Sequence, residues 1–206
     1  MSPALRYVIV AIAAYLMGSV SFGIIVSGAF HGPNLRKVGS KNTGASNVQR
    51  TMGWKYGLMT FFGDYAKAAL ACGLGWWLCG NLYGAMLAGL CVIIGHNWPV
   101  FFEFSGGKGV ACSVAVMLVC FPVPALICYA IGITVIAITR YISLGSMLVV
   151  TSYAILVSVF WSGGDLLIIL WSVLIAAFCI YRHRTNIDRL IHGTERKLGN
   201  KEKIDA

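Results

Sequence analysis

The chain has 206 residues, of which 58% are hydrophobic and 11% charged, and its mean hydropathy is +0.79. Because an average soluble domain carries about 25% charged residues, this composition excludes a soluble globular domain and indicates an integral membrane protein. The net charge of +9 does not indicate nucleic-acid binding, since the 16 Lys and Arg residues are spread between apolar runs and form no single basic face.

The apolar runs predict membrane-spanning helices. A helix needs roughly 20 apolar residues to cross a bilayer, whereas the strands of a membrane barrel would alternate in polarity. We therefore expect an all-α integral membrane protein with seven transmembrane helices in a single membrane domain, residues 1–206. The first run is longer than the apolar part of a signal peptide, so we expect it to be retained. The predicted spans are 7–30, 56–79, 82–95, 110–121, 125–139, 144–161 and 166–181, followed by a cytoplasmic tail at 182–206.

The distribution of positive charge predicts the orientation of these spans. Seven spans place three polar loops and the C-terminal tail on one side of the membrane, together with 14 of the 16 Lys and Arg residues. Of the other two, Arg6 lies on the opposite side and Lys67 lies within a span. By the positive-inside rule, the charged side is cytoplasmic and the N-terminus is outside. The three loops are residues 31–53, 96–109 and 140–143.

Two polar stretches on the cytoplasmic side have the composition of phosphate sites. Residues 39–50, the polar loop, supply hydroxyls, amides, glycines and two cations, which suit a small phosphorylated ligand. Residues 105–109, the glycine loop, precede the short run 110–121, so we expect them at a helix N-terminus that attracts anions. They do not form a nucleotide-binding P-loop, because Gly109 stands where that motif has a hydroxyl. We expect the short helix to be partly re-entrant, near the active site.

Asp64 and Lys67 lie inside the second predicted span, at a spacing of three residues that places them on one helix face. Ionisable groups at membrane depth suggest a function. We favour the other interpretation, a structural ion pair that orients the helix against its neighbours, and treat a ligand-binding role as secondary.

His183 and Asn186 lie on one face of the cytoplasmic extension of the last span. A basic helix that contacts anionic headgroups would explain the flanking Arg182 and Arg189, but not the paired imidazole and amide. Asp188 completes an H-x-x-x-x-D pattern, the spacing found in a different class of glycerolipid acyltransferases. On a continuous helix these two side chains point about 140° apart, so we interpret this match as chance.

Six stretches of the sequence form a recognisable series of motifs: residues 40–50, 95–99, 106–111, 140–144, 183–190 and 193–197. Together they resemble the bacterial membrane glycerol-3-phosphate acyltransferases that use acyl phosphate, the PlsY family. The resemblance extends over nearly the whole chain in motif order and spacing. One departure is Ser46, which stands where many relatives carry Thr and keeps the hydroxyl.

The resemblance implies transfer of a fatty acyl group from acyl phosphate to the 1-hydroxyl of glycerol 3-phosphate, which gives lysophosphatidic acid and phosphate in the first step of phospholipid synthesis. It implies no cofactor and no metal, and no pair of the seven cysteines has CxxC spacing. The expected catalytic residues are Ser40, Arg50, Lys108, Ser143, His183 and Asn186. The expected substrate-binding residues are Lys41, Asn42, Gly44, Ser46, Asn47, His96, Gly106, Gly107, Gly109 and Ser146.

We expect Arg50, Lys108 and His183 to neutralise glycerol 3-phosphate, and Ser46 and Asn186 to orient it. We expect the glycine loop, Ser40 and Ser143 to hold the acyl phosphate. Ser143 is favoured over Ser146 as the active-site serine. Asn42 and Asn47 are expected to hold the polar loop in shape. The proton of the attacking hydroxyl goes either to His183 or to a substrate phosphate oxygen.

The predicted setting is the bacterial cytoplasmic (inner) membrane, with the active site facing the cytoplasm. The expected partners are membrane lipid, the two substrates and the enzyme that makes acyl phosphate, with no nucleic acid and a monomeric chain. Acyl-CoA is the alternative donor. A transporter of an organic phosphate is the alternative function, but the short outer turns offer it no path to the outside. A structural membrane subunit is a third possibility, disfavoured by the number of polar groups between the spans.

Overall fold

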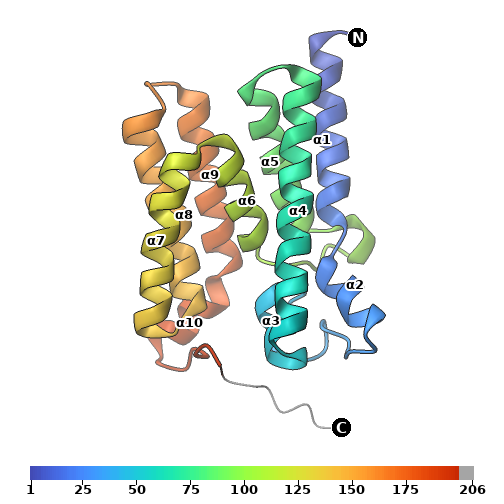
Figure 1. Cartoon of the computed structure of the whole chain (residues 1–206), viewed down its shortest axis with the longest axis vertical. Helices are drawn as coiled ribbons and strands as arrows, with labels where there is room; N and C mark the ends of the chain where they lie inside the picture. Colours follow the sequence, from blue (N-terminus) through green and yellow to red (C-terminus); the bar gives the residue numbers. More distant parts are fainter. Residues whose placement is uncertain (200–206) are drawn as a thin grey trace. The chain divides into compact units, whose positions relative to one another are not determined.

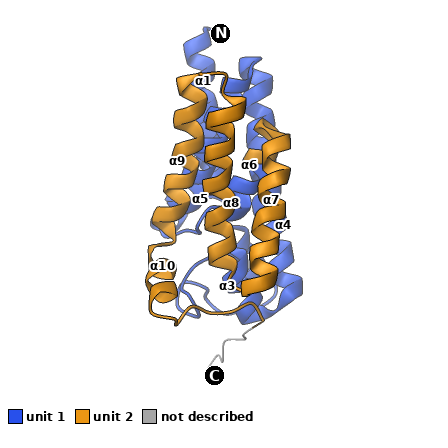
Figure 2. Cartoon of the chain, turned by 90° about the vertical axis from the view of Figure 1, so that its left-hand side faces the viewer, with its two compact units in different colours: residues 1–116, 201–206 blue, residues 117–200 orange. Residues whose placement is uncertain are grey.

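The computed structural model describes residues 1–199, and within them every regular element is a helix (Figure 1). The end of the predicted cytoplasmic tail, residues 200–206, which includes Lys201 and Lys203, lies outside the described residues. The chain divides into two compact units, one formed by residues 1–116 and one that begins at Met117 (Figure 2). Each unit is described in turn.

In the first unit, the three longer helices α1, α4 and α5 pack against one another, and the shorter α2 and α3 pack against α4. Glycine allows the closest contacts: a Cβ atom on Gly75 of α4 would lie 2.2 Å from the carbonyl oxygen of Gly84 in α5. Small residues of this kind allow membrane helices to approach closely. The elements are α1 (Pro3–Ser19), α2 (Phe22–Ala29), α3 (Ala45–Met52), α4 (Trp54–Cys79), α5 (Leu82–Asn97), the 3-10 turn Val100–Phe102 and the start of α6 (Val110–Cys120).

In the second unit, α8 packs against both α7 and α9. Tyr153 of α8 is fully buried, and its hydroxyl donates a hydrogen bond to the carbonyl oxygen of Met117 at 3.2 Å. Proline starts α7, where a missing N–H costs no hydrogen bond. The helices are α7 (Pro122–Thr139), α8 (Ile142–Leu156), which continues as a π-helical turn at Val157–Trp161, α9 (Leu166–Arg182) and α10 (Arg184–Ile191).

All seven predicted spans are helical in the structure, but the first is not continuous. Val20 and Ser21 have extended backbone conformations that separate α1 from α2. Four helical segments of the described chain are long and apolar enough to cross a membrane, and α9 with α10 would make a fifth. At 26 residues α4 is long but carries Asp64 and Lys67, and α6 has only 11 residues. The count of seven spans and the orientation of the termini therefore stay predictions.

The close approach of α4 and α5 gives a stability prediction. We expect Gly75→Ala to destabilise the protein by about 1–3 kcal/mol, the usual cost of overpacking, because its methyl group meets the Gly84 backbone. Gly73→Ala on the same helix is the matched control, since a Cβ atom there meets nothing within 4 Å. Thermal unfolding in detergent measures both variants, and equal stability would contradict the close packing.

Candidate functional site

The polar loop is held in shape by Asn47, which is almost fully buried. Its Oδ1 atom accepts a hydrogen bond from the backbone N–H of Ser40 at 2.9 Å, and its amide nitrogen donates to the carbonyl oxygens of Leu35 at 3.3 Å and Val38 at 3.2 Å. The second half of the loop is helix α3, whose last turn carries Arg50. The prediction that Asn47 holds the loop backbone is therefore confirmed.

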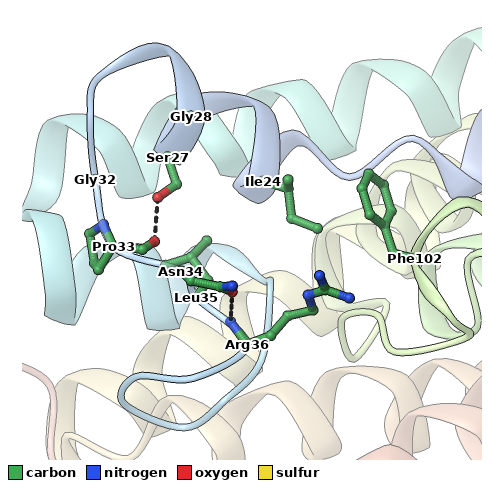
Figure 3. Close-up of a pocket in the computed structure, with 9 residues that line it drawn as sticks. All are labelled: Ile24, Ser27, Gly28, Gly32, Pro33, Asn34, Leu35, Arg36 and Phe102. Carbon is green, nitrogen blue, oxygen red and sulfur yellow. Dashed lines mark hydrogen bonds between the residues drawn. The ribbon is translucent and has the colours of Figure 1, made fainter.

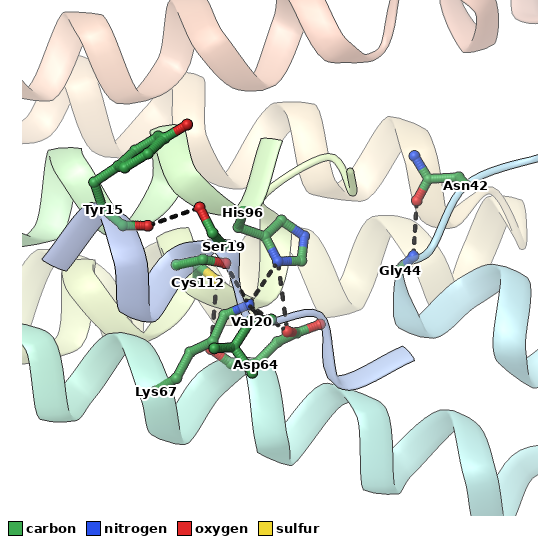
Figure 4. Close-up of polar contacts among 10 residues, drawn as sticks. Tyr15, Ser19, Val20, Asn42, Gly44, Asp64, Lys67, His96 and Cys112 are labelled. Atoms are coloured by element: carbon green, nitrogen blue, oxygen red, sulfur yellow. Dashed lines mark hydrogen bonds and ion pairs between the residues drawn. The ribbon is translucent and has the colours of Figure 1, made fainter. Parts of the chain in front are cut away.

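Asn42 joins the polar loop to the glycine loop. Its Oδ1 atom accepts from the backbone N–H of Gly44 at 2.9 Å (Figure 4), and its amide nitrogen donates to the carbonyl oxygen of Gly106 at 3.4 Å. Two residues 64 positions apart in the sequence therefore meet within the first unit, which brings the two loops into contact.

The glycine loop packs directly against His96. The backbone N–H of Gly107 donates to the His96 carbonyl oxygen at 3.0 Å. A Cβ atom on Gly106 would lie 2.1 Å from that oxygen, and one on Gly107 would lie 1.9 Å from Nε2 of the His96 ring. Both glycines are buried, and the half-buried Lys108 follows them just before α6 begins at Val110. The expected position of the glycine loop at a helix start is confirmed.

The same His96 ring belongs to a buried cluster of charged side chains on α4 and α5 (Figure 4). The predicted pair is present, with Lys67 Nζ 2.8 Å from Asp64 Oδ1. His96 Nδ1 lies 3.1 Å from Lys67 Nζ and 3.4 Å from Asp64 Oδ1. Lys67 also donates to the carbonyl oxygens of Gly18 at 3.0 Å and of Val20, at the break between α1 and α2. The spacing of Asp64 and Lys67 was visible in the sequence, whereas the participation of His96 was not.

In the second unit, Glu195 gathers three side chains. Its Oε1 atom accepts from Ser143 Oγ at 2.8 Å and from the Asn186 amide at 2.7 Å, and its Oε2 atom accepts from Arg189 Nε at 2.8 Å. The Glu195 side chain is only 2% exposed. Burial alone would raise the pKa of this carboxyl, but the hydrogen bonds from Arg189, Asn186 and Ser143 outweigh it and hold the pKa below its ordinary value.

Glu195 was absent from the predicted site residues, although it lies within one of the stretches that carry the resemblance. A single carboxylate in a loop has no periodic pattern that would show its burial. Ser143 and Asn186 were predicted, and the structure brings them together through this carboxylate. Ser146 instead donates to the carbonyl oxygen of Ile142 in its own helix at 2.8 Å.

His183 occupies the bend of 61° between α9 and α10, and its side chain is buried. Its Nδ1 atom lies 2.7 Å from the carbonyl oxygen of Cys179, which can only accept, so Nδ1 carries a proton. A neutral ring then has its acceptor nitrogen at Nε2. Asp188 is exposed and pairs with His192, at 3.4 Å between Oδ1 and Nδ1. The interpretation that His183 and Asp188 form no pair is confirmed.

A pocket of about 260 Å³ lies elsewhere in the first unit, between α2 and the loop that follows it (Figure 3). Ile24, Leu35 and Phe102 give it apolar walls, and Arg36 lies on one side. None of the predicted site residues lines this pocket, so it is distinct from the two clusters described above.

Comparison with known proteins places nearly the whole chain in one protein family. The sequence model of the family described as "Glycerol-3-phosphate acyltransferase" matches residues 8–193. A protein of that name from Thermoanaerobacter sp. (strain X514) is 43% identical over 197 residues, 96% of this chain and 98% of the relative. One from Clostridioides difficile (strain 630) is 42% identical over 201 residues, 95% of this chain and 97% of the relative.

Two similar solved structures are crystal forms of PlsY, described as an integral membrane glycerol 3-phosphate acyltransferase. The glycerol 3-phosphate form has a TM-score of 0.86 and 36% identity. The lysophosphatidic acid form has a TM-score of 0.83 and 34% identity. Each comparison covers 94% of this chain and 96% of the solved chain.

The Glu195 cluster predicts a pH-dependent contribution to stability. A carboxyl whose pKa is lowered by folding stabilises the protein above its unfolded pKa, about 4.3, and loses this effect as the pH falls through the folded value. We expect Glu195→Gln to lower the free energy of unfolding by about 2 kcal/mol at pH 7, and this difference from wild type to disappear in acid. Unfolding in detergent from pH 7 to pH 3 measures it. The exposed Asp188→Asn is the control, with a change below about 0.5 kcal/mol.

Proposed function

Because the chain belongs to the glycerol-3-phosphate acyltransferase family and is an integral membrane enzyme of the PlsY type, we propose that it transfers a fatty acyl group from acyl phosphate to the 1-hydroxyl of glycerol 3-phosphate. The products are lysophosphatidic acid and phosphate. The observation that carries this proposal is the family match over residues 8–193, which contains every predicted site residue from Ser40 to Asn186.

In the first unit, Arg50 and Lys108 bind the phosphate of glycerol 3-phosphate, with Ser46 orienting this substrate. The glycine loop and Ser40 hold the acyl phosphate. The supporting features are two cations on loops joined by Asn42, and glycines that precede the N-terminus of α6. Backbone N–H groups at such a terminus attract anions.

In the second unit, Ser143, His183 and Asn186 act on the reacting groups. The substrate hydroxyl oxygen attacks the acyl carbonyl carbon, the bond from that carbon to the phosphate oxygen breaks, and phosphate leaves with the bonding electrons. The hydroxyl proton goes to Nε2 of His183 or to a substrate phosphate oxygen. The hydrogen bond from Nδ1 to Cys179 supports His183, since it keeps Nε2 as the acceptor nitrogen. Because phosphate is a good leaving group, positioning and charge stabilisation suffice for most of the rate enhancement.

We further propose that the enzyme lies in the bacterial inner membrane as a monomer with seven spans, with its N-terminus outside and its site residues on the cytoplasmic side. The distribution of Lys and Arg supports this orientation. An enzyme that makes acyl phosphate supplies the donor.

A donor comparison tests the reaction. We expect purified protein in detergent to form lysophosphatidic acid from glycerol 3-phosphate and acyl phosphate, with little or no product from acyl-CoA at equal concentration. Mass spectrometry of the lipid product and release of inorganic phosphate give two independent readouts. Faster turnover with acyl-CoA would overturn the proposed donor. Phosphate movement across proteoliposomes without any lipid product would favour a transporter.

Loss of the cations that bind phosphate should weaken substrate binding. We expect Arg50→Ala and Lys108→Ala each to raise the KM for glycerol 3-phosphate at least about tenfold, because a charge-assisted hydrogen bond contributes about 1.5–3 kcal/mol. Lys37→Ala is the control, since Lys37 is an exposed lysine just before the polar loop. Steady-state kinetics measure all three. An unchanged KM in both site variants would remove these cations from the proposed site.

A further inference from the structure

The buried cluster on α4 and α5 has a defined hydrogen-bond arrangement. The Lys67 ammonium donates to the carbonyl oxygens of Gly18 and Val20, and it forms an ion pair with Asp64 Oδ1 at 2.8 Å. The Nδ1 atom of His96 lies 3.1 Å from Lys67 Nζ and 3.4 Å from Asp64 Oδ1. Asp64 and Lys67 thus hold the His96 ring from its Nδ1 side.

The opposite side of the same ring meets the glycine loop. The Nε2 atom leaves no room for a side chain on Gly107, where a Cβ atom would approach within 1.9 Å. Among the glycines of the loop, only Gly109 has a positive φ, of 75°. The need for glycine at position 107 therefore comes from the imidazole and not from the backbone conformation.

The loop is fixed to His96 through its backbone as well. Gly107 N–H donates to the His96 carbonyl oxygen, and Gly106 has no space for a Cβ atom beside it. Since Lys108 is the next residue, a shift of the imidazole displaces the cation proposed to bind phosphate. Misplacement of a binding group by about 1 Å is enough to cost up to about a hundredfold in rate.

We propose that Asp64, Lys67 and His96 are positioning residues: the ion pair orients the imidazole, and the imidazole holds the glycine loop in the geometry that places Lys108. His96 then acts through the loop, with a ring that is 4% exposed, instead of contacting substrate as the sequence predicted. The inference rests on the proposed function, because Lys108 matters to it only as a ligand of glycerol 3-phosphate.

A double-mutant cycle between His96 and Gly107 tests the contact that carries the proposal. We expect His96→Ala and Gly107→Ala each to raise the KM for glycerol 3-phosphate about tenfold, with kcat within about threefold of wild type. In the double variant the methyl group introduced by Gly107→Ala occupies the space left by the ring, so its KM should lie below that of either single variant. If the KM increases of the two single variants multiply in the double variant, the two positions act independently, since effects at independent sites add in free energy. That result would overturn the proposal.

A second cycle tests whether Asp64 acts through His96. Asp64→Asn should raise the KM for glycerol 3-phosphate in the wild-type background and have no further effect in the His96→Ala background. Thr60→Val is the control: Thr60 is fully buried one turn earlier on α4, and its hydroxyl has no hydrogen-bond partner among the described residues. The same KM increase in both backgrounds, or a lower thermal midpoint with an unchanged KM, would reduce the cluster to a structural role.

Two points of design separate a failure to fold, or an inactive wild type, from a failure of the positioning role. If Asp64→Asn does not yield folded protein, the His96–Gly107 cycle decides alone, because it changes neither member of the ion pair. Wild-type activity is measured first. Absence of lysophosphatidic acid from the wild-type protein with either donor refutes the proposed function, whereas an active wild type with independent variants refutes only the positioning role.

Discussion

A broken membrane helix needs hydrogen-bond donors for the carbonyl groups that the break releases, and here the ammonium of Lys67 supplies them. In the hydrocarbon region no water can do so, and each unsatisfied group costs several kcal/mol. Asp64 compensates the charge, and removal of one partner from a buried ion pair typically costs about 3–5 kcal/mol. The break in turn directs α2 toward the polar loop. The backbone of α2 at Gly23 approaches the carbonyl oxygen of Thr43 so closely that only glycine fits there.

The second unit uses the same principle with the opposite charge. Glu195 is a buried acceptor with three donors from two helices: Ser143 on α8, and Asn186 and Arg189 on α10. Each unit therefore fixes several polar side chains around buried charge whose partners come from different elements. Buried charged clusters of this kind restrict the motion of the side chains they hold, and such restriction suits a reaction in which an activated donor leaves positioning and charge stabilisation as the main tasks of the protein.

The sequence by itself determined the class of the protein, because each of its signals is local. Apolar runs, a charge asymmetry and the i, i+3 spacing of Asp64 and Lys67 are readable within one segment, and the structure has helices at all seven predicted spans and the predicted ion pair. Motif composition likewise indicated a phosphate site, and the resemblance it supported led to the family that the comparisons show.

The tertiary structure alone decided which polar residues meet. His96 joins Lys67 across 29 residues, and Ser143 joins Glu195 across 52. No periodicity within a segment encodes such distances, because they depend on how the helices pack and where they bend. The break at Val20 is equally hidden, because nothing in an apolar run shows that a lysine on another helix will donate hydrogen bonds to the carbonyl groups that the break releases. Local patterns therefore identify helices and motifs, while packing in a medium without water selects the contacts that fix them.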